Sequence, residues 1–274
     1  MTMFFVNGNQ QQNVPVNDRS FQYGDGCFTT ILVKDGQPVM LAEHKQRIAL
    51  TCQRLFITLP NWELVTEWID MAIERSGHKM QQLSGVKLHI SRGCGGRGYS
   101  PSGVNSTQVV VQTFAYPEHY STWQAEGIKV GVSATRLGVN PQLAGLKHNN
   151  RLEQVLIKKE IDNSGHDDNI VLDINGNVVE MSAANLFWIF NNQLYTPELL
   201  NSGVLGIKRK QVCEYAEQNN MIVNIGDYTL DDVTNADEVF ITNALHGVVP
   251  IIQISNKEFN IGAITCAIQE KINP

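Results

Sequence analysis

The feature that most constrains the fold is a run of short apolar segments, residues 169–196, divided by two tight turns. Asn175-Gly176 separates the first two segments, and this dipeptide is a strong signal for a two-residue β-hairpin. Asn191-Asn192 is a weaker signal of the same kind further along. Consecutive hairpins pair strands antiparallel, whereas a doubly wound sheet needs a helix between successive strands. The sequence therefore predicts an α+β fold and argues against a doubly wound one.

Apolar periodicity predicts further elements and two domains. The predicted strands are 28–33, 38–41, 86–91, 108–114, 128–134, 169–174, 178–181, 185–190, 193–196, 238–242 and 248–254. The predicted helices are 62–74, 150–161 and two that start near 42 and 206. Residues 116–124 are polar and carry a proline, as linkers do. We therefore expect a smaller α+β domain over 1–115, this linker, and a larger domain over 125–274.

Charge and cysteine content exclude several classes of protein. The net charge is −6, which gives a nucleic-acid partner no electrostatic support. No apolar stretch of about 18 residues is present, so we expect no membrane span. The N-terminal residues show no basic region followed by a long apolar run, so we expect no signal peptide. The five cysteines form no Cys-x-x-Cys pair, which favours a reducing cytoplasm and argues against a zinc site.

The glycine-rich segment 93–98 matches the pattern G-x-G-x-x-G and follows a predicted strand. A dinucleotide site also needs a helix directly after the glycines, because the helix start binds the pyrophosphate. Residues 99–103 include a proline and cannot begin that helix, so we reject the dinucleotide interpretation. The alternatives are a flexible loop and a substrate-binding loop in which Arg92 and Arg97 grip carboxylates.

Lys147 is the first candidate for catalysis. It follows the apolar run 143–146 and precedes a predicted helix with Leu152, Val155 and Leu156 on one face. This setting predicts an amine that points inward at a helix start, and burial lowers the pKa of a lysine, which suits an imine-forming amine. A solvated surface lysine is the structural alternative.

Glu180 and the segment 203–207 are two further candidates. Glu180 lies between two apolar residues, where a carboxylate needs a cationic partner such as a protonated pyridine; an exposed hairpin residue is the alternative. Gly203 and Gly206 lead into a predicted helix, whose backbone N–H groups and dipole favour an anion. A plain helix-entry loop explains that segment equally well.

Together these segments resemble the fold-type IV pyridoxal-phosphate (PLP) enzymes, which include branched-chain aminotransferases, D-amino-acid aminotransferases and aminodeoxychorismate lyases. The resemblance covers nearly the whole chain. It rests on five segments in the family's order: 18–26, 43–47, 140–151, 179–187 and 206–207. It implies a two-domain α+β fold like that of the D-amino-acid aminotransferases, PLP as the cofactor, a small-molecule substrate and a homodimer.

The resemblance also implies roles for single residues. Lys147 matches the lysine that binds PLP covalently, Glu180 the carboxylate that keeps the pyridine nitrogen protonated, and Arg47 the phosphate-binding arginine. The other implied phosphate contacts are the helix start at Ile207 and Lys208 and a second turn at Asn243 and Ala244. Some aminotransferases place a threonine in that turn, so the alanine departs from the pattern.

Within the family, residues 26–30, 91–100 and 145–154 resemble the lyases. Thr29 stands where the aminotransferases typically place an acidic residue. The resemblance implies conversion of 4-amino-4-deoxychorismate to 4-aminobenzoate and pyruvate, a step in folate biosynthesis. Lys147 would remove the substrate proton, Thr29 or Lys147 would act on the leaving group, and Arg92 or Arg97 would hold carboxylates. A fold-type IV aminotransferase acting on branched-chain or D-amino acids is the alternative.

Overall fold

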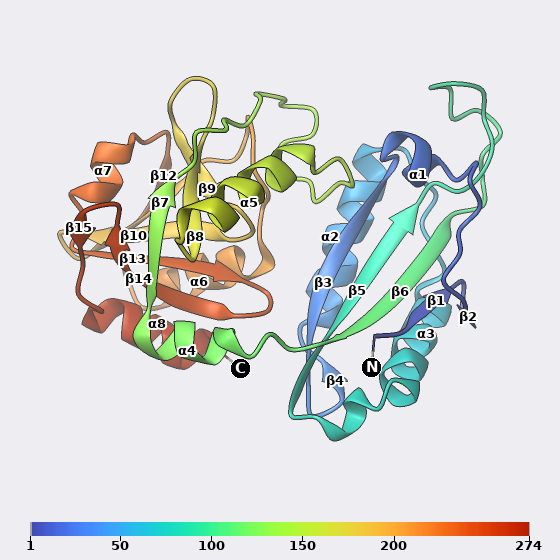
Figure 1. Ribbon diagram of the computed structural model, residues 1–274, viewed down its shortest axis with the longest axis horizontal. Helices are drawn as coiled ribbons and strands as arrows, with labels where there is room; N and C mark the ends of the chain where they lie inside the picture. The colour runs from blue at the N-terminus through green and yellow to red at the C-terminus, as the bar shows by residue number, and fades with distance from the viewer. Residues whose placement is uncertain (1, 274) are drawn as a thin grey trace. The chain divides into compact units, whose positions relative to one another are not determined.

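The computed structural model describes residues 2–273, which form two compact units (Figure 1). Unit 1 comprises the chain up to Pro117 and also Lys147–Asn150, and unit 2 comprises Glu118–Leu146 and the chain from Arg151 onward. The expected linker 116–124 is largely helical, because α4 (His119–Glu126) begins within it and belongs to unit 2. The short segment that carries Lys147 therefore belongs to the N-terminal unit, although 29 residues of unit 2 precede it in the sequence.

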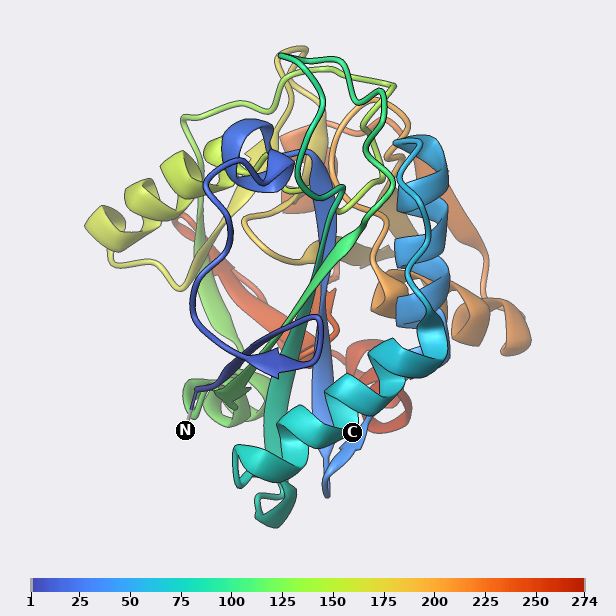
Figure 2. The same cartoon turned by 90° about the vertical axis from the view of Figure 1, so that its right-hand side faces the viewer.

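Unit 1 is a six-stranded sheet covered on one face by helices (Figure 2). Its strand order is β2 (Asn9–Gln10), β1 (Phe4–Val6), β6 (Gln108–Ala115), β5 (Leu83–Ser91), β3 (Gly26–Lys34) and β4 (Gln37–Pro38). Its helices are α1 (Arg19–Tyr23), α2 (Leu41–Arg54), α3 (Trp62–Arg75) and the 3₁₀ turn η1 (His78–Met80). The strand expected over 38–41 is wrong beyond Pro38, because α2 begins at Leu41.

The pairing of β3 with β5 decides which side chains share a face of this sheet. Cys27 and Ile31 face α2 and α3 and join the core with Ile48 of α2 and Ile69 of α3. Since side chains alternate along a strand, Phe28 and Thr30 face the other way. Phe28 pairs with His89 and Thr30 with Lys87, so these four side chains share the face that the helices leave uncovered.

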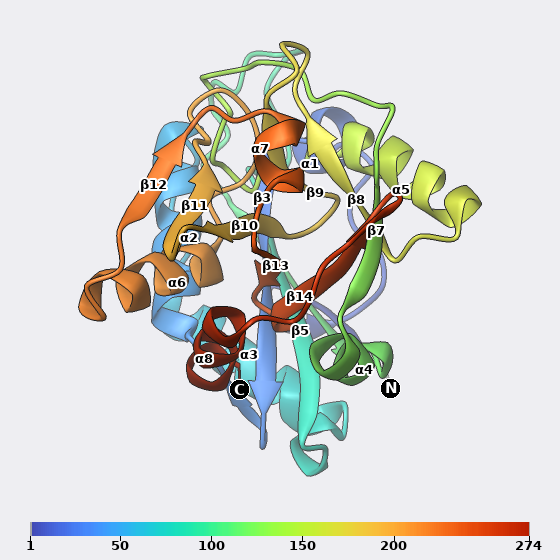
Figure 3. The same cartoon turned by 90° about the vertical axis from the view of Figure 1, so that its left-hand side faces the viewer.

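Unit 2 is built on a nine-stranded sheet (Figure 3). Its strand order is β12 (Val223–Gly226), β11 (Gln193–Pro197), β10 (Asn185–Phe190), β13 (Glu238–Asn243), β14 (Gly247–Ile254), β7 (Ile128–Val132), β8 (Asp168–Leu172) and β9 (Val178–Met181), with β15 (Lys257–Glu258) beside β14. Its further helices are α5 (Leu152–Ser164), α6 (Ile207–Gln218), α7 (Leu230–Thr234) and α8 (Ala263–Ile272). The apolar faces of α6 and α8 pack on the stacked rings of Phe187 and Phe240.

The two predicted hairpins are present, but they do not form one continuous meander. β8 pairs with β9 and β10 pairs with β11, all antiparallel. Asn191 and Asn192 both adopt positive φ, 51° and 59°, as a type I′ turn requires. β9 and β10 are not paired strands, however, because β13, β14, β7 and β8 lie between them in the sheet order.

The expected orientation of α5 is wrong. Leu152, Val155 and Leu156 are 79%, 61% and 58% exposed, whereas Ile157 and Ile161 are the residues that α5 buries. The sequence offered two overlapping apolar stripes, and only the second matches the packing surface. Among the described residues, no helix has the length and apolar character needed to cross a membrane.

Candidate active site

Lys147 lies on an added edge of the unit 1 sheet. The Phe28 N–H donates to the Lys147 carbonyl at 3.0 Å, and the Asn149 N–H donates to the Gly26 carbonyl at 3.0 Å. This pairing places Lys147 opposite Phe28, and the Lys147 Nζ lies 4.8 Å from the centroid of the Phe28 ring. The amine is therefore held on the face that the helices leave uncovered. It does not lie at a helix start as expected, because α5 begins five residues later.

Two basic residues that sequence reasoning missed share this face with Lys147. The Lys87 Nζ lies 4.6 Å from the Phe28 ring centroid, and the His89 ring stacks on Phe28 at 6.4 Å. Burial lowers the pKa of Lys87. Burial, and then the charge of Lys87, lower the pKa of His89 to about 4, so this imidazole is neutral at pH 7. The alternation of Lys87 and His89 along β5 was visible in the sequence, but their pairing with β3 was not.

Thr29 points toward α2, away from Lys147. Its side chain is 0% exposed, and its hydroxyl lies 2.6 Å from His44 Nδ1. Arg47 Nη2 also donates to this hydroxyl. Because His44 and Arg47 are three residues apart, one turn of α2 presents both side chains to Thr29. Thr29 therefore helps to position the guanidinium of Arg47. The sequence pointed to Arg47 and Thr29 but not to His44, which lies one helical turn before Arg47.

Arg92 is occupied by contacts within unit 1. Its guanidinium donates to both carboxylate oxygens of Asp25, at 2.7 and 2.9 Å, and to the carbonyls of Leu55 and Phe56. Arg19 donates to the same carboxylate at 2.8 Å. Burial raises the pKa of Asp25, but the bonds from Arg92 and Arg19 outweigh burial and hold this pKa below its usual value. Arg92 is thus a structural anchor, which leaves Arg97 as the candidate for substrate carboxylates.

The glycine-rich loop is a held structure rather than a flexible one. Arg19 donates to the carbonyls of Gly98 and Tyr99, each at 3.0 Å. Gly93 has φ +104° and approaches the Ser106 carbonyl so closely that a Cβ would lie 2.0 Å from its oxygen. The side chain of Arg97 is exposed. The loop enters no helix, which agrees with the rejected dinucleotide interpretation.

Glu180 is a buried carboxylate in unit 2. It is 5% exposed, and its Oε2 accepts the N–H of Val204 at 3.0 Å. Gly145 pairs with the residues on either side of Val204. The Gly145 N–H donates to the Gly203 carbonyl at 3.0 Å, and the Gly145 carbonyl accepts the Leu205 N–H at 3.1 Å. The charge of Glu180 also acts on Arg151, whose pKa burial lowers and Glu180 raises. In the sequence, Gly145 is only two residues from Lys147.

The start of α6 suits an anion. Gly206, the N-cap, provides no side-chain hydrogen bond to the first turn. A Cβ at Gly206 would lie 2.0 Å from Asn185 Oδ1, so a larger residue would displace the Asn185 side chain, which donates to the Val204 carbonyl. Backbone N–H groups at such a start bind phosphates well. The Lys208 side chain points elsewhere, since its Nζ donates to the Ile272 carbonyl and to Gln211, so only its backbone can serve.

The predicted second turn lies between β13 and β14. Asn243 Oδ1 accepts the N–H groups of Leu245 and His246 at 2.9 and 3.0 Å. Its Nδ2 donates to the Ala183 carbonyl at 3.2 Å. Asn243 therefore shapes the turn with its side chain, and Ala244 can offer only backbone groups.

The chain carries the chemical groups that PLP needs. These groups are the Lys147 amine, which lies against the Phe28 ring, and the buried Glu180 carboxylate. They also include the Arg47 guanidinium, which Thr29 holds in place, and the helix start at the N-cap glycine of α6. Among residues 2–273, no group of three His, Cys, Asp or Glu side chains is suited to a metal ion. The amine, the carboxylate, the guanidinium and the glycine helix start together fit an organic phosphate cofactor.

Comparison with known proteins agrees with this chemistry. Residues 26–254 match the family described as amino-transferase class IV. The chain is 46% identical to an aminodeoxychorismate lyase of Vibrio harveyi over 99% of this chain and 100% of the relative. It is 27% identical to a D-alanine aminotransferase of Bacillus licheniformis, covering 91% and 86%. The crystal structure of 4-amino-4-deoxychorismate lyase from Pseudomonas aeruginosa aligns with a TM-score of 0.88 at 32% identity, covering 98% and 97%.

Proposed function

Because the chain belongs to the class IV aminotransferase family, we propose that it is a PLP-dependent lyase that converts 4-amino-4-deoxychorismate to 4-aminobenzoate and pyruvate. The observation that carries this proposal is the 46% identity to an aminodeoxychorismate lyase along the full length of both chains. The family resemblance and the α+β fold predicted from the sequence are confirmed by the same matches. The roles of single residues are proposals.

Four features of the chain would hold the cofactor. Lys147 would attach to its aldehyde carbon, and Glu180 would balance a positive charge on its ring nitrogen. Arg47 and the backbone N–H groups of Ile207 and Lys208 would bind its phosphate. The turn at Asn243 and Ala244 would add backbone groups to this phosphate site. When bound, PLP supplies an electron sink for the carbanion formed beside the amino nitrogen.

Lys147 is the proposed acid–base group. Once the substrate amine has replaced it on the cofactor, the freed Lys147 amine would take the proton from the ring carbon that bears the substrate nitrogen. The electron pair left behind expels the enolpyruvyl oxygen as the carbon–oxygen bond breaks, and the ring becomes aromatic. The expelled enolpyruvate takes up a proton and becomes pyruvate. Since no amino group is lost, the reaction needs no keto-acid acceptor.

We assign the donation of a proton to the expelled enolpyruvate to Lys147 rather than to Thr29. The Thr29 hydroxyl already binds Arg47 and His44 on the helix-facing side of β3. Lys147 and Thr30 share the opposite face with Phe28, so Thr30 is the threonine placed to assist Lys147. Thr29 acts on the cofactor phosphate indirectly, by positioning Arg47.

The substrate carries two carboxylates, which need basic partners. Arg97 has an exposed side chain on a loop that Arg19 holds in place. Lys87 lies on the same face as Lys147. We propose Arg97 for one carboxylate and Lys87 for the other, in place of Arg92, which Asp25 occupies.

We also propose a cytoplasmic homodimer. The apolar stripe Leu152, Val155 and Leu156 is exposed on α5, and an exposed apolar patch commonly marks a protein interface. All five cysteines are free. These include Cys27 and Cys52, whose sulfurs lie 3.9 Å apart, and free thiols suit a reducing compartment.

A product assay tests the function. The purified protein with PLP and 4-amino-4-deoxychorismate should release 4-aminobenzoate and pyruvate in equal amounts. Lys147→Ala should abolish both products, whereas Lys129→Ala, which changes an exposed lysine of β7, should leave both unchanged. An aminotransferase is the second candidate, because a D-alanine aminotransferase is also a relative. Turnover only with an amino acid and 2-oxoglutarate would establish that alternative.

A further inference from the structure

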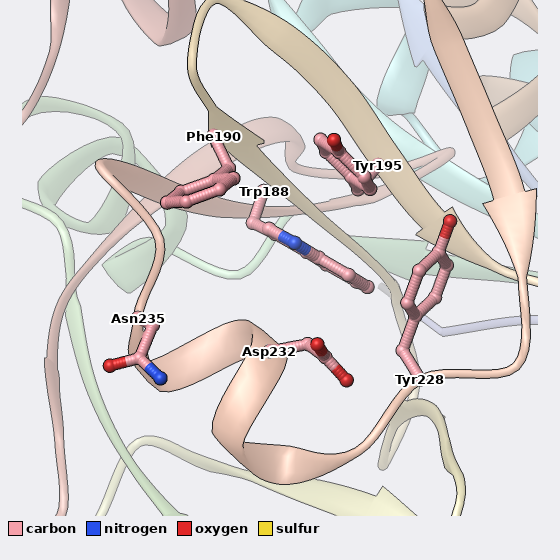
Figure 4. A pocket seen from close by; sticks show the side chains of 6 residues that line it. All are labelled: Trp188, Phe190, Tyr195, Tyr228, Asp232 and Asn235. Atoms are coloured by element: carbon pink, nitrogen blue, oxygen red, sulfur yellow. The ribbon is translucent and has the colours of Figure 1, made fainter.

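A small aromatic pocket lies in unit 2 among residues that the proposed function does not use (Figure 4). Its volume is about 220 Å³, and its lining residues are Trp188, Phe190, Tyr195, Tyr228, Asp232 and Asn235. The residues come from β10, β11 and the segment around α7. Four aromatic rings, three of which also pack in the core of unit 2, and one carboxylate line this small space.

The rings form a preorganised wall. Tyr195 stacks on Trp188 at 5.8 Å with an interplanar angle of 15°, and Tyr228 meets Trp188 edge-on at 4.9 Å. Trp188 is 1% exposed, so it forms the floor, while Phe190 is 40% exposed at the rim. Because the rings hold one another, the pocket does not have to reorganise to accept a ligand.

The carboxylate of Asp232 is also fixed. Its Oδ2 accepts the N–H of Thr229 at 2.7 Å and the Thr229 hydroxyl at 2.8 Å in a capping box. In Figure 4, Asp232 lies below the Trp188 ring and beside Tyr228. Burial, and then Tyr195 and the charge of Asp232, raise the pKa of Tyr228. The pocket is therefore electronegative, and it combines aromatic faces with a neighbouring negative charge.

We propose that this pocket binds the head group of a small organic cation, of the quaternary ammonium class. Ring faces attract such cations through their quadrupole, and aromatic cages are the usual way in which proteins recognise quaternary ammonium groups. The Asp232 carboxylate adds direct charge attraction to such a cation. The volume lies below the roughly 300 Å³ at which pockets for drug-sized ligands begin, so the pocket suits a small cation.

The test compares choline with its neutral isostere, 3,3-dimethylbutan-1-ol, by calorimetric titration of the full chain at constant ionic strength. The two probes have nearly the same shape and differ in charge. We expect saturable binding of choline at least tenfold tighter than that of the alcohol, a difference of about 1.4 kcal/mol. Phe190→Leu and Asp232→Asn should each weaken choline several-fold. Asp231→Asn, which changes the adjacent carboxylate outside the pocket lining, should not.

Three outcomes would overturn the proposal. Equal affinity for choline and the alcohol would show a merely apolar pocket. Equal weakening by Asp231→Asn and Asp232→Asn would show diffuse attraction to an acidic surface. No saturable binding of choline to the wild-type chain, with a circular dichroism spectrum that shows it folded, would show no site at all. None of these results depends on lyase activity, so this proposal and the proposed function fail separately.

Discussion

Asp25 joins two buried arginines, and its replacement by asparagine should destabilise unit 1 strongly. The carboxylate accepts one bond from Arg19 and two from Arg92. The side chains of Asp25, Arg19 and Arg92 are 15%, 4% and 10% exposed, so solvent screens these ion pairs little. Asparagine keeps the shape but leaves two buried cations without a counter-charge.

Removing one partner of a buried ion pair costs about 3–5 kcal/mol. For a domain of this size, each kcal/mol lowers the melting temperature by roughly 4 °C, so we expect a loss of about 12 °C or more. Chemical denaturation in urea, followed by far-UV circular dichroism, measures the change in unfolding free energy. Asp35→Asn, at an exposed turn after β3, is the matched control and should change stability by less than about 0.5 kcal/mol.

The pH dependence supplies a second readout. The pKa of Asp25 is lower in the folded chain than its value of 3.8 without these partners. Its stabilising effect is therefore complete above about pH 4 and is lost as the pH falls through the folded-state pKa. The wild type and Asp25→Asn should thus converge in stability below pH 4. If Asp25→Asn is as stable as Asp35→Asn at pH 7, the anchor described for Arg92 does not exist, and Arg92 becomes available for substrate again.

Three further predictions concern cofactor binding and assembly. Gly206→Ala should weaken PLP binding at least tenfold, measured by titrating the visible absorbance, because its Cβ meets Asn185; unchanged affinity would refute the phosphate site at α6. Thr29→Val should raise the dissociation constant of PLP several-fold while kcat at saturating PLP falls less, since Thr29 holds Arg47. A collapse of kcat alone would return Thr29 to proton transfer. Leu156→Glu should shift light-scattering mass from dimer to monomer, and an unchanged mass would exclude α5 from the interface.

The sequence predicted single strands, turns and helices better than it predicted which of them lie side by side. The hairpin around residues 191 and 192 followed from local turn chemistry, because asparagine tolerates positive φ there. By contrast, the separation of β9 from β10 depends on long-range strand pairing, for which the sequence carries no local signal. Helix α8 was missed for a similar reason, because its buried Ile268 and Ile272 become a recognisable face only against α6.

The candidate site divides in the same way. The resemblance located Lys147, Glu180 and Arg47 by their segments. It could not choose between Arg92 and Arg97, because the partner that occupies Arg92 is 67 residues away in the sequence. Nor could it find the partners of Thr29, since the direction of that side chain depends on which face of β3 meets α2.

Mapping the covalent attachment of PLP tests the central claim most directly, because two lysines flank the Phe28 ring. The Nζ atoms of Lys87 and Lys147 lie 4.6 and 4.8 Å from its centroid. Borohydride reduction of the PLP-loaded protein, followed by proteolysis and mass spectrometry, should place the pyridoxyl group on the peptide that contains Lys147 and leave Lys87 unmodified. A pyridoxyl group on Lys87, or on neither lysine, would contradict the account.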